Sequence, residues 1–294
     1  MRTREQILKK VRELEIKSKK LATELFSGEY HSAFKGKGMS FKEVREYAPG
    51  DDVRFIDWNV SARIGHPYSK IFEEERELTV MMLIDISSSE LFGTSYGRKR
   101  DLAAELAAVL AFSAVANADK VGAIFFSDKI ELYVPPKKGR QQALFIVREM
   151  LGLTPGSKGT NIGAAIRFFS NATKQGCIAF LLSDFLDKNY EDALRVAGKK
   201  HDVIGIRLYD RMDKELPNAG LIQLMDAETD ATQWVDSGNA YVRRKYEEAF
   251  FQRTAYCAEV FKKANSDLLH LKTGDDYINV LRRFFKSRVK GGIK

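Results

Sequence analysis

The sequence from Leu78 to Ser89 reads LTVMMLIDISSS. The run Leu78–Ile86 is almost continuously apolar and contains β-branched residues, which is typical of a central parallel strand buried on both faces. Asp85 and the serines that follow form a D-x-S-x-S pattern where this strand is expected to end. Ligands of open α/β sheets bind at the carboxyl ends of the strands. This stretch therefore indicates both the centre of the fold and the place of its site.

Downstream of this stretch, apolar strand-like runs alternate with helical patterns. We expect strands over 121–126, 130–134, 177–182, 203–208 and 268–271, two short strands within 221–235, and helices over 98–117, 140–151, 161–173, 190–198, 241–264 and 277–287. Such alternation predicts an α/β fold, with a central, mostly parallel sheet and helices on both faces.

The chain before residue 78 has a different character. Residues 4–26 carry an apolar stripe at helical spacing, which predicts a helix. Residues 28–78 are rich in glycine, charge and aromatic residues, and the segment Ala48–Asp51 is a strong turn signal. We therefore predict an N-terminal helix and β-rich module over 1–77 and an α/β domain over 78–294.

The polar residues expected at the strand ends suggest a metal site. Asp85 would end a buried strand, where an unpaired carboxylate is costly, and Ser87 and Ser89 would add hydroxyl oxygens from the same turn. Thr160 opens a predicted helix and Asp184 follows a later strand, so both should reach the same edge of the sheet. Carboxylate and hydroxyl oxygens suit Mg²⁺, or Mn²⁺. The alternative is that these residues only cap helices and form turns.

Composition narrows the classes of function. The 294 residues carry a net charge of +8 and two cysteines without a C-x-x-C pair, which argues against a zinc-thiolate site or a disulfide scaffold. The excess of Lys and Arg lies at the two ends, within 1–20 and 282–294, and the residues between are slightly acidic. Basic ends can contact nucleic acid or an anionic membrane surface, but solvated helix faces explain them more simply. No apolar run has membrane-spanning length and no signal peptide is recognised, so we expect a cytoplasmic protein.

The order of these ligands along the chain resembles the metal-ion-dependent adhesion site of von Willebrand factor type A domains. Further segments resemble the bacterial "domain of unknown function fifty-eight" family. The segments that carry this second resemblance are GMSF (38–41), VREY (44–47), PGDDVR (49–54), IDW (56–58), AR (62–63), PY (67–68), ER (75–76), LP (216–217), Gly220, DAE (226–228) and the predicted helix 241–264.

The resemblance implies a Rossmann-like type A domain that follows a short β-rich module. It implies that Asp85, Ser87, Ser89, Thr160 and Asp184 hold Mg²⁺, and that a partner protein supplies an Asp or Glu carboxylate to the metal. Genes of this family commonly lie beside one for a MoxR-type AAA+ ATPase, which implies an adaptor with a chaperone-like or complex-maturation role rather than an enzyme.

Charged residues near the two motifs are weaker candidates for partner binding. Glu90 follows the D-x-S-x-S pattern where the family often has Met, and it could add negative charge near the metal or point to solvent. Arg45, Arg54 and Arg63 lie in the charged stretch of the N-terminal module. They could form a second partner surface, but we favour ion pairs that fix this module against the sheet domain.

Competing enzyme classes fit the sequence less well. Ser95 lies in a G-x-S-x-G pattern, and Asp184 and His270 follow it in the chain order of an α/β hydrolase, yet Ser95 comes several residues after the strand end. His270 is expected within an apolar strand and so in the core. A haloacid dehalogenase-type phosphotransferase would need a second Asp where Ser87 stands. The sequence has neither a P-loop pattern nor histidines at zinc-ligand spacing.

Overall fold

A computed structural model gives the structure of the protein, and it describes residues 4–26, 40–48, 51–73, 78–91, 93–94, 97–225 and 230–290. Its centre is a six-stranded sheet in the order β12-β9-β8-β3-β6-β7. The strands are β3 (Thr79–Asp85), β6 (Lys120–Phe126), β7 (Ile130–Lys137), β8 (Ile178–Ser183), β9 (Asp202–Tyr209) and β12 (Asp267–Lys272). Each predicted strand of this sheet is confirmed to within a few residues.

The central position of β3 follows from its composition. It pairs in parallel with β6 on one side and with β8 on the other, and every residue from Val80 to Asp85 is buried. A strand covered on both faces needs apolar side chains in both directions, which is why this run is nearly continuous. The edge strand β7 runs antiparallel to β6, because the two are joined by a short hairpin connection.

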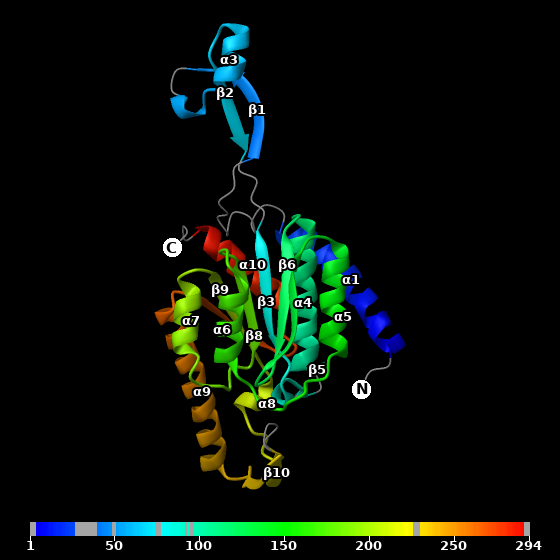
Figure 1. The fold of residues 1–294 in the computed structure, drawn as a ribbon. Helices are drawn as coiled ribbons and strands as arrows, with labels where there is room; N and C mark the ends of the chain where they lie inside the picture. Colours follow the sequence, from blue (N-terminus) through cyan, green and yellow to red (C-terminus); the bar gives the residue numbers. More distant parts are fainter. Residues whose placement is uncertain are drawn as a thin grey trace.

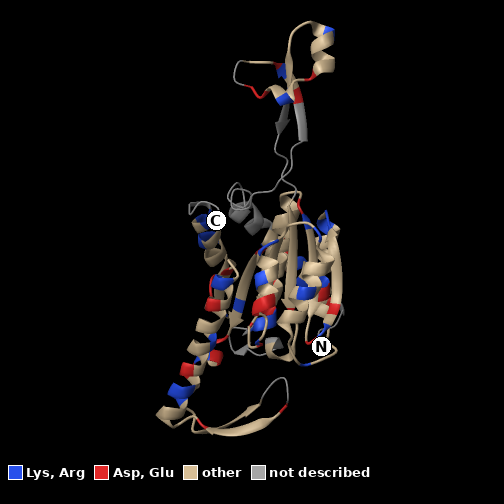
Figure 2. Ribbon diagram, turned by 60° about the vertical axis from the view of Figure 1, so that its left-hand side comes forward, with Lys and Arg blue, Asp and Glu red and all other residues tan. Residues whose placement is uncertain are grey.

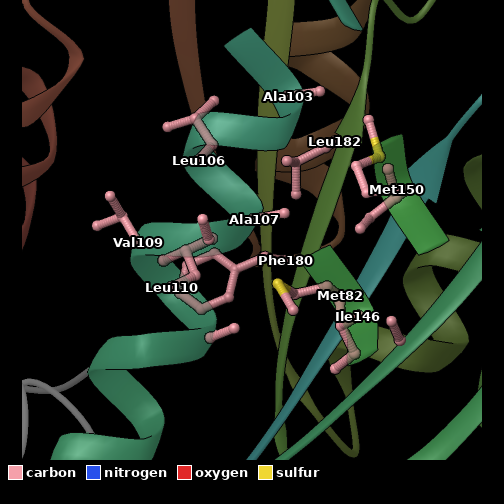
Figure 3. Close-up of a cluster of buried hydrophobic side chains, with 14 of the residues drawn as sticks. Met82, Ala103, Leu106, Ala107, Val109, Leu110, Ile146, Met150, Phe180 and Leu182 are labelled. Carbon is pink, nitrogen blue, oxygen red and sulfur yellow. The ribbon is translucent and has the colours of Figure 1, made fainter. Parts of the chain in front are cut away.

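Helices cover both faces of the sheet (Figure 1). One face carries α1 (Arg4–Phe26), α4 (Lys99–Ala116), α5 (Arg140–Gly152) and α10 (Tyr277–Lys290), and the other carries α6 (Ile162–Ala172), α7 (Glu191–Gly198) and α9 (Ala240–Lys263). Alternate residues of β3 serve the two layers, with Met82 in the first core and Met81 in the second. Figure 3 shows Met82 in the first layer with side chains of α4, including Leu106 and Leu110.

The helix α1 packs on the sheet domain. Val11 and Leu14 belong to its first core, together with residues of α4 and α5. Two ion pairs hold the same helix, from Lys17 to Glu105 at 2.6 Å and from Arg140 to Glu15 at 2.5 Å. The part of the chain before β3 therefore does not form a single module, because its first helix packs into the core of the α/β domain.

A small unit lies apart from the sheet domain in Figure 1. It consists of β1 (Ser40–Glu46), η1 (Val53–Phe55), α3 (Trp58–Ile64) and β2 (Tyr68–Glu73), with β1 and β2 antiparallel. Its ion pairs among the described residues are internal: Arg45 with Asp51, Arg54 with Asp52 and Lys70 with Asp57. The expectation that such pairs fix the module against the sheet domain is therefore wrong for the residues described. The oppositely charged residues are close in sequence, so they form ion pairs with one another inside the module.

The remaining short elements extend the carboxyl edge of the sheet. They are η2 (Ser88–Leu91), β4 (Gly93–Thr94), β5 (Gly97–Arg98), α8 (Arg211–Lys214), β10 (Leu221–Met225) and β11 (Thr232–Asp236). The strands β10 and β11 form an antiparallel pair, as predicted for 221–235. At the other end of the chain, Arg288 binds Asp202 at 2.8 Å, so part of the basic C-terminal charge is neutralised within the fold. Of the helices in the described ranges, none combines the length and the hydrophobicity that crossing a membrane requires.

Docking of α1 through Leu14 can be tested by mutation. Leu14 is 2% exposed and Leu8, on the same helix, is 54% exposed. We expect Leu14→Ala to lower the free energy of unfolding by about 2–5 kcal/mol, because it leaves a cavity in the first core. Leu8→Ala, the matched control, should change it by less than about 0.5 kcal/mol. Urea unfolding measures both, and equal small effects would contradict the packing of α1 on this core.

Candidate functional site

The site begins where β3 ends, at Asp85. The side chain of Asp85 is fully buried, and its Oδ1 accepts a hydrogen bond from the Ser87 backbone N–H at 2.9 Å. Its Oδ2 accepts one from the Ser183 hydroxyl at 2.7 Å. The hydroxyls of Ser87 and Ser89 lie 3.2 Å apart. The D-x-S-x-S turn therefore brings a buried carboxylate and several buried hydroxyls together at the end of β3.

The loop that carries Thr160 lies beside this turn. The Ser88 N–H donates to the Lys158 carbonyl at 3.2 Å, and Thr160 lines the same cleft as Ser89. The alternative that Thr160 caps the following helix is wrong, because the side chain of Asn161 accepts from the Ala164 N–H as the N-cap of α6. Thr160 therefore lies at the cleft beside the D-x-S-x-S turn and does not cap α6.

Asp184 reaches the same edge but already has a cationic partner. It is buried directly after β8, and the Lys99 ammonium lies 2.9 Å from its Oδ2. Lys99 begins α4, is itself buried, and lies 3.5 Å from a carboxylate oxygen of Asp213 in α8. A lysine thus occupies the space between two carboxylates at the edge of the predicted metal site.

Sequence reasoning missed Lys99 and Ser183 as members of the site. Ser183 could have been found, because parallel pairing of β8 with β3 brings its end next to Asp85. Lys99 gave no such signal, since the sequence does not fix which side of the first turn of α4 faces the sheet. Arg207 of β9 is a third buried group there, and its Nε donates to the Asp184 carbonyl at 3.3 Å.

The electrostatics of the site show a shortage of positive charge at Asp85. Burial, and then the nearby Asp184 carboxylate, raise the pKa of Asp85 to about 7, against the lowering effect of hydrogen bonds from Ser87 and Ser183. A divalent cation beside Asp85 would favour its ionised form. The described residues contain no cluster of three or more His, Cys, Asp or Glu side chains, so any metal there would depend on the hydroxyls. Two carboxylates and three hydroxyls are hard oxygen donors, and they fit Mg²⁺ or Mn²⁺.

The other predicted residues lie elsewhere or outside the described part of the chain. Ser95 lies outside the described residues, and the side chain of Glu90 is not described. His270 lies on β12 as predicted, but the expectation that it is buried in the core is wrong, because β12 is an edge strand and the His270 side chain is exposed. The predicted partner residues of the small unit, Arg45, Arg54 and Arg63, are not brought to Asp85, and in Figure 1 their unit lies at the opposite end of the sheet from α8.

The raised pKa of Asp85 predicts a pH dependence of stability. In the unfolded chain this carboxyl ionises near 3.8, but in the metal-free folded protein it ionises at about 7. The wild type should therefore lose stability as the pH rises from 4 through 7, because the unfolded state releases the proton more readily. Asp85→Asn removes this loss. We expect its stability relative to the wild type to increase progressively as the pH rises from 4 to 8.

Urea unfolding in EDTA at several pH values measures this gain. Asp192→Asn, a change at an exposed carboxylate of α7, is the control and should show no such trend. A stability difference between Asp85→Asn and the wild type that does not change with pH would contradict the assignment.

Comparisons with known proteins identify a family model and a relative for this chain. The sequence matches the family described as "Protein of unknown function DUF58" over residues 43–256. The uncharacterized protein Rv1480 of Mycobacterium tuberculosis is 30% identical over 286 residues, which cover 96% of this chain and 90% of that protein.

Solved structures show a similar fold. An aerotolerance-related membrane protein from Bacteroides fragilis matches with a TM-score of 0.51 and 18% identity, over 73% of this chain and all of that one (100%). The VWA domain of SpRpn10 matches with a TM-score of 0.38 and 12% identity, over 74% and 99% of the two chains. The mostly parallel six-stranded sheet with helices on both faces is the α/β arrangement that the sequence indicated. Because the family match covers most of the sequence and the relative matches nearly all of it, this chain belongs to the DUF58 family of proteins of unknown function.

Proposed function

We propose that this protein is a metal-dependent adaptor that binds other proteins through a divalent cation, Mg²⁺ or Mn²⁺, held beside Asp85. The observation that carries the proposal is the buried oxygen cluster at the end of β3, where Asp85 has a raised pKa and lies next to two serine hydroxyls. A divalent cation would supply the missing positive charge. Ser87, Ser89 and Thr160 would hold it with Asp85, and Asp184 would contribute while shared with Lys99.

Such a cation would recognise acidic groups on a partner. Most of its ligands would be neutral hydroxyls, so much of its positive charge would stay available to a carboxylate from another protein. Ser89 and Thr160 line a cleft that is open at the surface, which gives an incoming side chain access. The buried groups around Asp85 are serines and a lysine bound to two carboxylates, and this set suits an ion-binding site rather than proton transfer to a substrate.

The proposed partner is a MoxR-type AAA+ ATPase, or a protein on which that ATPase acts, in the cytoplasm. The support is that this chain belongs to the family. The resemblance implies that the gene of a family member lies beside a gene for such an ATPase. The role would be chaperone-like, with the adaptor holding a client while the ATPase works on it.

Partner capture tests the metal dependence. We expect the immobilised wild type to capture a purified MoxR-type ATPase from the same genome, or an ATPase–client complex, in Mg²⁺ but not in EDTA. Asp85→Ala should reduce capture at least tenfold, because the cation loses its buried carboxylate ligand. Asp192→Ala is the matched control, since this aspartate is exposed and pairs only with Arg195 among the described residues. Equal capture with and without Mg²⁺ by all three proteins would contradict the proposal.

The position of Lys99 makes a second prediction about metal affinity. Its ammonium cancels the charge of Asp184, which the cation would otherwise share. We expect Lys99→Met to bind Mn²⁺ about tenfold more tightly, a gain of about 1.4 kcal/mol. The variant should also melt at a lower temperature in EDTA, because Asp184 and Asp213 lose their buried partner.

Electron paramagnetic resonance of free Mn²⁺ measures this affinity. Lys245→Met removes an exposed lysine of α9 and should leave the affinity unchanged. Weaker or unchanged Mn²⁺ binding by Lys99→Met would contradict a metal position near Asp184.

A further inference from the structure

A cleft of about 1500 Å³ extends from the candidate metal site along α9. Ser89 and Thr160 lie at one part of its lining. Residues 185–188 after β8, residues of α9 and residues of the β10–β11 pair line the rest. Figure 2 shows the N-terminal half of α9 and this strand pair extending beyond the carboxyl edge of the sheet. Pockets for small molecules commonly measure about 300–1000 Å³, so this cleft has room for a segment of polypeptide.

The α9 wall of the cleft presents one face of the helix. Tyr246, Ala249, Arg253 and Tyr256 line the cleft and recur every three or four residues. The two tyrosine hydroxyls are already bound, from Tyr246 to the Met212 carbonyl and from Tyr256 to Glu191. Among the described residues, Arg253 is therefore the member of this face with an unused hydrogen-bond donor.

Two cations of the cleft have no anionic partner among the described residues. Across the described ranges, neither Lys188 nor Arg253 has a carboxylate within ion-pair distance, and the Arg253 Nε is buried without a hydrogen-bond partner. Asp187 is the carboxylate of the lining, but it accepts from the backbone N–H groups of Ile162 at 2.8 Å and of Lys188 at 2.6 Å. Arg253 lines the cleft, so an incoming carboxylate would give its guanidinium an anionic partner.

The cleft also exposes apolar side chains on two of its sides. Leu186, after β8, is 42% exposed, and Met225, at the end of β10, is 65% exposed. A two-stranded pair such as β10–β11 is marginally stable without further packing. A partner that covered Met225 and Leu186 would bury apolar surface and support this pair.

We propose that the cleft receives an extended, acidic segment of a partner protein, with a carboxylate bound by Arg253 and apolar side chains lying on Leu186 and Met225. This inference rests on the proposed function, which assigns a first carboxylate of the partner to the cation beside Asp85. It adds a second anchor, Arg253 on α9, which would bind a second carboxylate of the partner. The expected partner segments therefore carry two separated acidic residues. The charge of Lys188 and the size of the cleft both match such a segment.

The test uses a phage-displayed library of random dodecapeptides selected on the full-length wild type in Mg²⁺. We expect the enriched peptides to contain two Asp or Glu residues separated by apolar positions. A fluorescein-labelled copy of the most enriched peptide then gives dissociation constants by anisotropy. Arg253→Gln should weaken its binding at least tenfold and Met225→Ser several-fold, and Asn in place of one peptide carboxylate should remove the effect of Arg253→Gln.

The matched control is Arg244→Gln. Arg244 lies on the same helix, is exposed and pairs with Glu248 outside the cleft. Its replacement should leave peptide binding unchanged, and thermal melting should confirm that all variants fold. A labelled thymidine dodecanucleotide that bound more tightly than the peptide, and lost binding in Arg253→Gln, would overturn the peptide assignment in favour of nucleic acid.

The outcomes separate this inference from the proposed function. Peptides that need Mg²⁺ and Asp85 but bind Arg253→Gln like the wild type would overturn the second anchor and leave the metal-dependent function intact. Peptides that need Arg253 but bind equally in EDTA and to Asp85→Ala would support the cleft and contradict the metal. A selection that enriches no peptide on the wild type would overturn the cleft as a peptide site.

Discussion

The burial of one carboxylate at the end of the central strand is the constraint on which the rest of the site depends. Asp85 lies in β3, which is covered by helices on both faces, so water cannot solvate its charge. Ser87 and Ser183 donate hydrogen bonds to Asp85, yet the pKa of Asp85 still rises to about 7. A buried carboxyl group with a strongly raised pKa is typical of functional sites.

Two buried cations organise the part of this edge beside Asp184. Lys99 connects the start of α4 to Asp184 and to Asp213 of α8. Arg207 joins the backbone of Asp184 to α9, because its guanidinium lies over the Phe250 ring at 4.7 Å from the centroid. These contacts link segments that are distant in sequence and hold α9 beside the site. The cleft along α9 is therefore built onto the same network of charges as the candidate metal site.

Much of the fold was predictable because its strands are buried. The continuous apolar runs that became β3 and β8 admit few other interpretations, and their carboxyl ends had to meet at one edge. The candidate residues Asp85, Ser87 and Ser89 were predictable for the same reason, since they follow the central strand directly. The exposure of His270 was not predictable, because an apolar run of four residues does not reveal whether its strand is central or at an edge. The internal ion pairs of the small unit were also missed, because charge content alone does not select partners.

The sequence by itself determined the α/β class, the central strand and the residues that lie at its end. These features follow from the hydrophobic pattern of short segments and from the order of those segments along the chain. Only the tertiary structure decided which groups face those residues. Lys99 comes from the first turn of α4, and Arg253 comes from the middle of α9. Their positions depend on how each helix is rotated on the sheet, which is set by the packing of the two cores as a whole. Long-range packing therefore placed the charges that surround Asp85, although the sequence had already placed Asp85 itself.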